Sequence, residues 1–111
     1  MTWHEVVALG LALPGVAVGT SYGRPAIKLR GKMLAAGGKD DDHFVLRAGL
    51  ELIELLMADD PVTFYQTPHY EGWPAVLVRY ATADPERIAV LLAQAWEGYA
   101  TKAQRAARRG D

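Results

Sequence analysis

The sequence predicts an α+β fold: a single domain over residues 1–111, with an antiparallel sheet and helices packed on one face of it, in the order α-ββββ-α-ββ-α. The chain has 111 residues, of which 50% are hydrophobic, and this is enough for one core. Helix-like and strand-like hydrophobic periodicities alternate along the chain. The segments between neighbouring strands are too short for the crossovers that a parallel sheet needs, so the strands are predicted to be antiparallel.

The first helix is predicted over Trp3–Ala12. Thr2 and Glu5 fit a capping box, in which the hydroxyl of Thr2 accepts a hydrogen bond from the amide of Glu5 while the carboxylate of Glu5 reaches back. Apolar residues then repeat at helical spacing until Pro14, followed by a glycine, ends the helix.

Four strands are expected to follow as an antiparallel meander. Apolar and polar residues alternate along them, as they do in half-buried strands. Gly31 permits a tight reversal between the second and third strands, and the segment 37–42, rich in glycine and aspartate, makes another turn. The predicted strands are Val18–Tyr22, Ala26–Arg30, Lys32–Ala36 and His43–Arg47.

The rest of the chain shows a short helix, two strands and a longer helix. The short helix is amphipathic, and the strands again show alternation. Asp84 is typical of an N-cap residue, and the proline after it is typical of the first helical position. The predicted elements are the helix Leu50–Met57, the strands Thr63–Gln66 and Ala75–Tyr80, and a helix from Pro85 to Tyr99.

The composition excludes several classes of protein. There is no cysteine, so the chain has no disulfide framework, cysteine-ligated cluster or thiol nucleophile. The longest apolar stretch, from Val6 to Val18, is interrupted by glycine and proline and does not span a bilayer. Because no basic segment precedes it as in a secretory signal, we expect a cytoplasmic protein with no membrane association.

The charges are unevenly distributed. The net charge is −1, whereas a dedicated nucleic-acid-binding domain usually has a pI above about 9. However, no acidic residue lies between Glu5 and Asp40, a stretch with five lysines or arginines, and acidic residues dominate from Asp40 to Asp60. The last ten residues are again basic. A near-neutral total can therefore hide one positive and one negative side, although solvated charges can also segregate by chance.

Several motifs resemble the MmcQ/YjbR-like family. They are Leu13-Pro14-Gly15-Val16 after the first helix, Gly23-Arg24-Pro25 leading into Lys28, and Thr67-Pro68-His69-Tyr70-Glu71-Gly72-Trp73-Pro74-Ala75-Val76. The likeness covers nearly the whole chain. It implies a small α+β domain with a double-wing DNA-binding arrangement.

Basic residues on the predicted strands are the candidate DNA contacts. Lys28 and Arg30 are two residues apart, so on a strand both side chains project from one face, about 7 Å apart. Hairpins with basic tips can bind DNA weakly and largely through its phosphates, by counterion release. The alternative is a solvated outer face of the sheet. The candidate residues are Arg24, Lys28, Arg30, Lys32, Arg105, Arg108 and Arg109.

The last three candidates lie on a basic tail from about residue 101, which is expected to continue the last helix. Cations near the C-terminal end of a helix complement its dipole, and they can also contact a phosphate backbone. A solvated, fraying terminus is the alternative.

The aromatic loop 67–74 is a second candidate surface. His69 can titrate near neutral pH, and Tyr70 and Trp73 can stack on bases or line a small-molecule pocket. This loop suggests an alternative function, a protein- or small-ligand-binding module with no role in DNA binding. The architectural alternative is that Trp73 fills the core and that His69 bonds to a backbone carbonyl.

The sequence does not predict an enzyme. The three histidines, His4, His43 and His69, lie on separate elements without metal-ligand spacing, and glycine motifs for nucleotides are absent. The aspartates at 40–42 are expected to form a solvated turn rather than a cation site. No catalytic residue, cofactor or metal is therefore expected, and a monomer is expected by default.

Overall fold

The structure, a computed structural model, describes residues 1–110. None of the helices within these residues is both long and apolar enough to cross a membrane. The predicted order α-ββββ-α-ββ-α is confirmed, and a further helix follows it. The elements are α1 (Trp3–Leu11), β1 (Val16–Ser21), β2 (Arg24–Leu29), β3 (Lys32–Gly37), β4 (His43–Arg47), α2 (Leu50–Asp59), β5 (Phe64–Tyr65), β6 (Ala75–Arg79), α3 (Pro85–Tyr99) and α4 (Lys102–Arg109).

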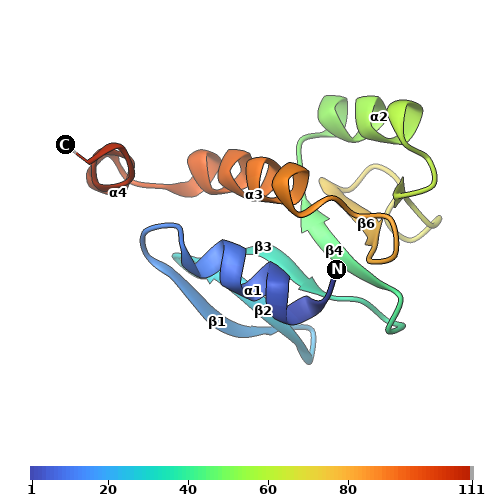
Figure 1. Cartoon of the computed structure of the whole chain (residues 1–111), viewed down its shortest axis with the longest axis horizontal. Coiled ribbons are helices and arrows are strands. Elements are labelled where there is room, and N and C mark those ends of the chain that lie inside the picture. The colour runs from blue at the N-terminus through green and yellow to red at the C-terminus, as the bar shows by residue number, and fades with distance from the viewer. Residues whose placement is uncertain (111) are drawn as a thin grey trace.

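The six strands form one sheet in the order β1-β2-β3-β4-β6-β5, and every neighbouring pair is antiparallel. β1 to β4 are the predicted meander. After β4 the chain passes through α2 to the edge of the sheet as β5, then returns as β6 between β5 and β4 (Figure 1). The predicted antiparallel sheet is therefore confirmed.

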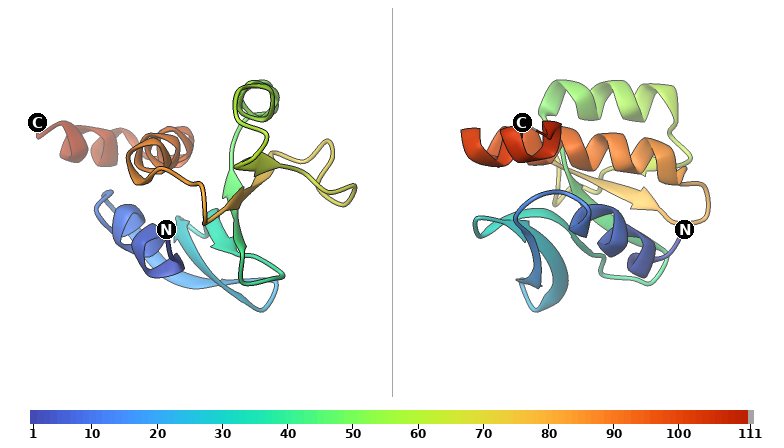
Figure 2. Two further views of the ribbon diagram at one scale, coloured as in Figure 1. Left: turned by 45° about the vertical axis from the view of Figure 1, so that its right-hand side comes forward. Right: turned by 60° about the vertical axis from the view of Figure 1, so that its left-hand side comes forward.

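The helices α1, α2 and α3 pack on one face of the sheet, as predicted (Figures 1 and 2). Side chains from these three helices and from β2 to β6 form the main core. Gly10 allows α1 to lie close to β2, because a Cβ at this position would overlap the side chain of Ile27. The largest fully buried side chains of this core are Trp96, Phe44, Phe64, Ile27, Leu29 and Leu34.

The opposite face of the sheet carries no helix but has a smaller apolar cluster. In β4, for example, Phe44 and Leu46 belong to the main core while Val45 faces the other way. This alternation is the one predicted for a strand. The smaller cluster contains Val45, Ala75 and Leu77, with Met33, Tyr65 and Tyr70 packed against it. We call this side the helix-free face.

Thr2 caps α1 as predicted, because the amide of Glu5 donates to its hydroxyl oxygen over 3.2 Å. The carboxylate of Glu5 accepts from the same hydroxyl, 3.3 Å away, rather than from a backbone amide. One half of the predicted capping box is therefore present.

The basic tail forms a separate helix, so the prediction that it continues the last helix is wrong. Ala100 has extended backbone, with φ −68° and ψ 145°, and is 6% exposed. Thr101 then starts α4 with a full capping box. The amide of Gln104 donates to the hydroxyl of Thr101 (3.1 Å), and the side-chain oxygen of Gln104 accepts from the amide of Thr101 (2.9 Å). These two bonds satisfy amides that lose their partners where the helix breaks.

Candidate nucleic-acid interface

Two tight turns shape the hairpins of β1, β2 and β3. Tyr22 and Gly23 connect β1 to β2, and Arg30 and Gly31 connect β2 to β3. All four residues have positive φ, of 52°, 78°, 54° and 77°. This is the pattern of type I′ turns, whose twist matches that of the strands they join.

Arg30 therefore lies in a turn and not on a strand, since β2 ends at Leu29. The prediction that Arg30 and Lys28 project from one strand face is wrong, because the chain leaves the strand before Arg30. Instead, Nη1 of Arg30 donates to the carbonyl oxygen of Tyr99, 3.3 Å away. Tyr99 is the last residue of α3, and a cation complements the partial negative charge at that end of a helix.

Two arginines of α4 lie against α3. Arg105 donates to the carbonyl oxygen of Glu97 over 3.2 Å, and its Nε lies 3.7 Å from the Glu97 carboxylate. The guanidinium carbon of Arg108 is 5.8 Å from the centroid of the Trp96 ring, within cation–π range. These contacts hold the basic tail on the body of the protein, in contrast to the alternative of a fraying terminus.

The turn after α1 supports both C-terminal helices. The indole N–H of Trp96 donates to the carbonyl oxygen of Pro14 over 2.8 Å. Gly15 has φ of +78°, and a Cβ there would lie 2.5 Å from the side-chain nitrogen of Gln104. The Leu-Pro-Gly segment thus has a structural role, because it positions α3 and gives α4 a surface to lie on.

The remaining basic candidates divide into two groups. Lys32 is exposed and begins β3 directly after the turn that contains Arg30. Lys28 lies on the helix-free face of β2, where its side chain passes over Gly19 of β1. Arg24 is on the same face but four residues earlier, about 13 Å along the strand. The structure therefore brings Arg30 and Lys32 to the α4 end of the molecule and leaves Arg24 and Lys28 on the helix-free face.

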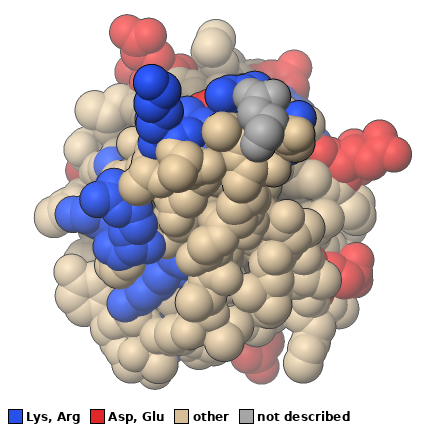
Figure 3. All heavy atoms as spheres, turned by 90° about the vertical axis from the view of Figure 1, so that its left-hand side faces the viewer, with Lys and Arg blue, Asp and Glu red and all other residues tan. Residues whose placement is uncertain are grey.

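Figure 3 views the molecule from the α4 end. Lysine and arginine side chains gather along two sides of this face, and acidic side chains lie mostly toward its edges. Six of the candidate cations can be compared: Arg24, Lys28, Arg30, Lys32, Arg105 and Arg108. Within residues 1–110, Arg105 alone among these six has a carboxylate oxygen within 4.0 Å. We call Arg30, Lys32, Arg105, Arg108 and Arg109 the basic end.

The aromatic loop between β5 and β6 lies at the opposite end of the molecule from α4 (Figures 1 and 2). The side-chain nitrogen of Gln66 holds the loop, because it donates to the carbonyl oxygens of Tyr70 (3.1 Å) and Ala75 (2.8 Å). Sequence reasoning missed Gln66, since no spacing pattern marks a side chain that bonds to backbone carbonyls. The two candidate surfaces are thus separate.

Trp73 is 63% exposed, so the interpretation that it fills the core is wrong. Tyr70 is the loop residue that packs inward, on the smaller apolar cluster. His69 is exposed, and its ring stands edge-on to that of Tyr70 with centroids 5.0 Å apart. No hydrogen bond to its ring is present within residues 1–110, so the alternative in which it bonds to a backbone carbonyl is wrong. The loop therefore presents His69 and Trp73 to solvent.

A polar cluster at the start of β4 was missed by sequence reasoning. Nδ1 of His43 lies 2.8 Å from Oδ1 of Asp42, and the histidine side chain is 8% exposed. The hydrogen bond with His43 lowers the pKa of Asp42 below its ordinary value. Ligand atoms of Asp40, Asp42 and His43 lie within 4.8 Å of one another. The contact is a hydrogen bond between neighbouring residues at the point where the β3–β4 turn enters β4.

The family model YjbR matches residues 11–98 of this chain. The uncharacterised protein Mb2600 of Mycobacterium bovis is 43% identical to this chain, in a match that covers 86% of this chain and 85% of that protein. The uncharacterised protein Rv2570 of Mycobacterium tuberculosis (strain H37Rv) matches to the same extent.

A solved structure shows the same fold. The crystal structure of Deinococcus radiodurans protein DR2400, which contains the domain DUF419, superposes with a TM-score of 0.73 at 20% identity. The match covers 94% of this chain and 85% of that chain. Together with the family model and the mycobacterial relatives, it confirms the resemblance predicted from the motifs. The chain belongs to the YjbR family.

Proposed function

We propose that the protein binds duplex DNA weakly and mainly through its phosphates, using the basic end. The observation that supports this is the gathering of cations from distant parts of the chain. Arg30 and Lys32 come from the β2–β3 hairpin, and Arg105 and Arg108 come from α4. Of these four, only Arg105 has a nearby carboxylate within residues 1–110.

Cations without carboxylate partners are available to phosphates. Each phosphate contact releases a condensed counterion, and this supplies affinity without sequence information. Arg24 and Lys28 on the helix-free face, four residues apart, extend the positive potential along β2. The overall charge of −1 keeps the affinity low, because the acidic side of the molecule repels the rest of the duplex.

The proposal is tested by titrating a short labelled duplex with the protein and following fluorescence anisotropy. At about 50 mM salt we expect a Kd in the micromolar range or weaker, with log K falling linearly as log salt rises. Two duplexes of unrelated sequence should bind equally. No detectable binding at about 50 mM salt, where phosphate contacts are strongest, contradicts the proposal.

The exposed aromatic loop favours a second candidate function, the binding of a protein or small ligand. An exposed tryptophan whose backbone is held in place can contact a partner at little entropic cost. Trp73 is 63% exposed, and Gln66 anchors the loop that carries it. A partner that is retained by the protein and lost on Trp73→Ala with His69→Ala, with an unchanged Tm, would support this function. Retention of the same partner by the variant would contradict it.

A further inference from the structure

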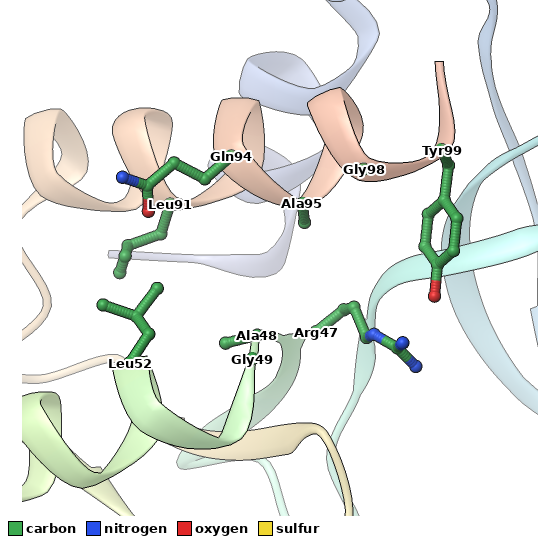
Figure 4. A pocket seen from close by; sticks show the side chains of 9 residues that line it. All are labelled: Arg47, Ala48, Gly49, Leu52, Leu91, Gln94, Ala95, Gly98 and Tyr99. Atoms are coloured by element: carbon green, nitrogen blue, oxygen red, sulfur yellow. The ribbon is translucent and has the colours of Figure 1, made fainter. Parts of the chain in front are cut away.

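A cleft of about 240 Å³ lies between α2 and α3. It forms because α2 packs on β5 and β6 whereas α3 packs on α1, β3 and β4, which leaves space between the two helices. Leu52 of α2 and Leu91 of α3 point toward each other across the cleft, and Arg47 and Tyr99 converge at its other end (Figure 4). One end of the cleft is therefore lined by these two leucines together with the polar side chain of Gln94, and the other end is cationic (Figure 4).

Arg47 has no anionic partner in the described chain. No carboxylate oxygen of residues 1–110 lies within 4.0 Å of its guanidinium group. Its contact is with the ring of Tyr99, whose centroid is 5.3 Å from the guanidinium carbon. This stacking restricts the arginine side chain while its N–H groups remain free to donate.

Two glycines border the cleft, and neither is required by an unusual backbone angle or by a close contact, although Gly49 is the N-cap residue of α2. Gly49 precedes α2, and Gly98 lies in the last turn of α3. Neither has a positive φ, and a Cβ added at either position meets no atom within 4 Å. Glycine within a helix is less stable than alanine there. What these two residues preserve is open space at the cationic end of the cleft.

We infer that this cleft binds a small organic carboxylate whose apolar part is a single ring or a short chain. The carboxylate bonds to Arg47, since a guanidinium group matches the two oxygens of a carboxylate. The apolar part lies between Leu52 and Leu91. The ligand is smaller than drug-sized compounds, which occupy pockets of about 300–1,000 Å³. The inference is independent of DNA binding, because no residue of the basic end lines the cleft.

Three probes with the same ring and different charge test the inference: phenylacetate, phenylacetamide and phenethylamine. Each is titrated into isotope-labelled protein, and the amide signals of Gly49 and Gly98 are followed by NMR. We expect phenylacetate to bind about tenfold more tightly than phenylacetamide, the value of a charge-assisted hydrogen bond, and phenethylamine to bind most weakly. Equal binding of the three compounds, or no shift with any of them, overturns the inference.

Two variants locate the site. Arg47→Gln should bring the affinity for phenylacetate down to that for phenylacetamide, and Gly98→Leu should abolish both by filling the cleft. The matched control is Val90→Leu, on the side of α3 that faces Arg108, which should bind like the parent protein. If Gly98→Leu lowers the Tm, Gly49→Leu fills the cleft from the α2 side. Unchanged binding in a folded cleft-filling variant overturns the inference.

Discussion

The indole N–H of Trp96 donates a 2.8 Å hydrogen bond to the carbonyl oxygen of Pro14 and so joins α3 to the turn after α1. Trp96 is fully buried, and it is the largest such side chain in the core. The same turn also supports α4, because Gly15 lies against Gln104. The turn after α1 therefore contacts both α3 and α4.

Trp96→Phe should lower the free energy of unfolding by about 2 kcal/mol, because it leaves the Pro14 carbonyl unpaired and opens a cavity. The measurement is urea denaturation followed by circular dichroism. The matched control is Trp73→Phe, which removes the same atoms from a side chain that is 63% exposed. It should change the stability by less than about 0.5 kcal/mol. Equal effects of the two substitutions would contradict the assigned roles of the tryptophans.

Gly15→Ala should destabilise the protein by more than about 1 kcal/mol, because φ is positive at Gly15 and a Cβ would contact the side chain of Gln104. Gly98→Ala is the control, since Gly98 has ordinary helical backbone and open space around it. It should stabilise the protein by up to about 1 kcal/mol. Thermal unfolding of both variants checks the prediction, and a stable Gly15→Ala protein would show that α4 does not rest on this turn.

Asp42 should make stability depend on acid pH. Its pKa is lowered by the hydrogen bond with His43, so folding favours the ionised form. The resulting stabilisation is present above the ordinary aspartate pKa, about 4, and is lost as the pH falls through the lower value of the folded state. Asp42→Asn should therefore be less stable than the parent protein at about pH 6, and the difference should be smaller at about pH 3. Urea denaturation at both values measures this, and a difference that does not change with pH refutes it.

Periodicity and capping residues predicted most of the fold because the relevant interactions are local. Asp84 is one example: its carboxylate accepts from the amide of Glu86 over 3.1 Å, as expected for an N-cap. The strands His43–Arg47 and Ala75–Arg79 pair side by side with the predicted alternation. The cap and the alternation within each strand follow from neighbours within a few residues, whereas the pairing of these two strands joins residues about 30 positions apart.

Two predictions were wrong because the local hydrophobic pattern does not show where α3 and β2 end. The residues that follow Thr101 favour helix, so the tail resembled a continuation of α3, and only the capping box of Thr101 and Gln104 marks the new start. Arg30 resembled a strand residue because alternation continues through it. Gly31 is the better signal of a turn, because Tyr22 and Gly23 form the same kind of turn as Arg30 and Gly31.

The basic end itself depends on tertiary structure. The length of α3 and the break at Ala100 determine that α4 lies near the β2–β3 turn. The residues of the turn and of the tail do not by themselves indicate that the two lie close together. The exposure of Trp73 also cannot be seen in the local sequence, because it depends on hydrogen bonds from the side chain of Gln66 to carbonyl oxygens of the loop. Sequence reasoning found the basic residues but not which of them lie together.

The most direct test of the basic end compares two double variants of equal net charge in the DNA titration. Lys32→Gln with Arg108→Gln removes two cations from the basic end. Lys39→Gln with Arg87→Gln removes two from elsewhere, one beside Asp40 and one that pairs with Asp59 at 2.9 Å. We expect the first variant to bind more weakly at about 50 mM salt and to reduce the slope of log K against log salt by about 0.9 for each lost phosphate contact. The second should bind like the parent protein, and equal losses in both variants would contradict a localised DNA-binding surface.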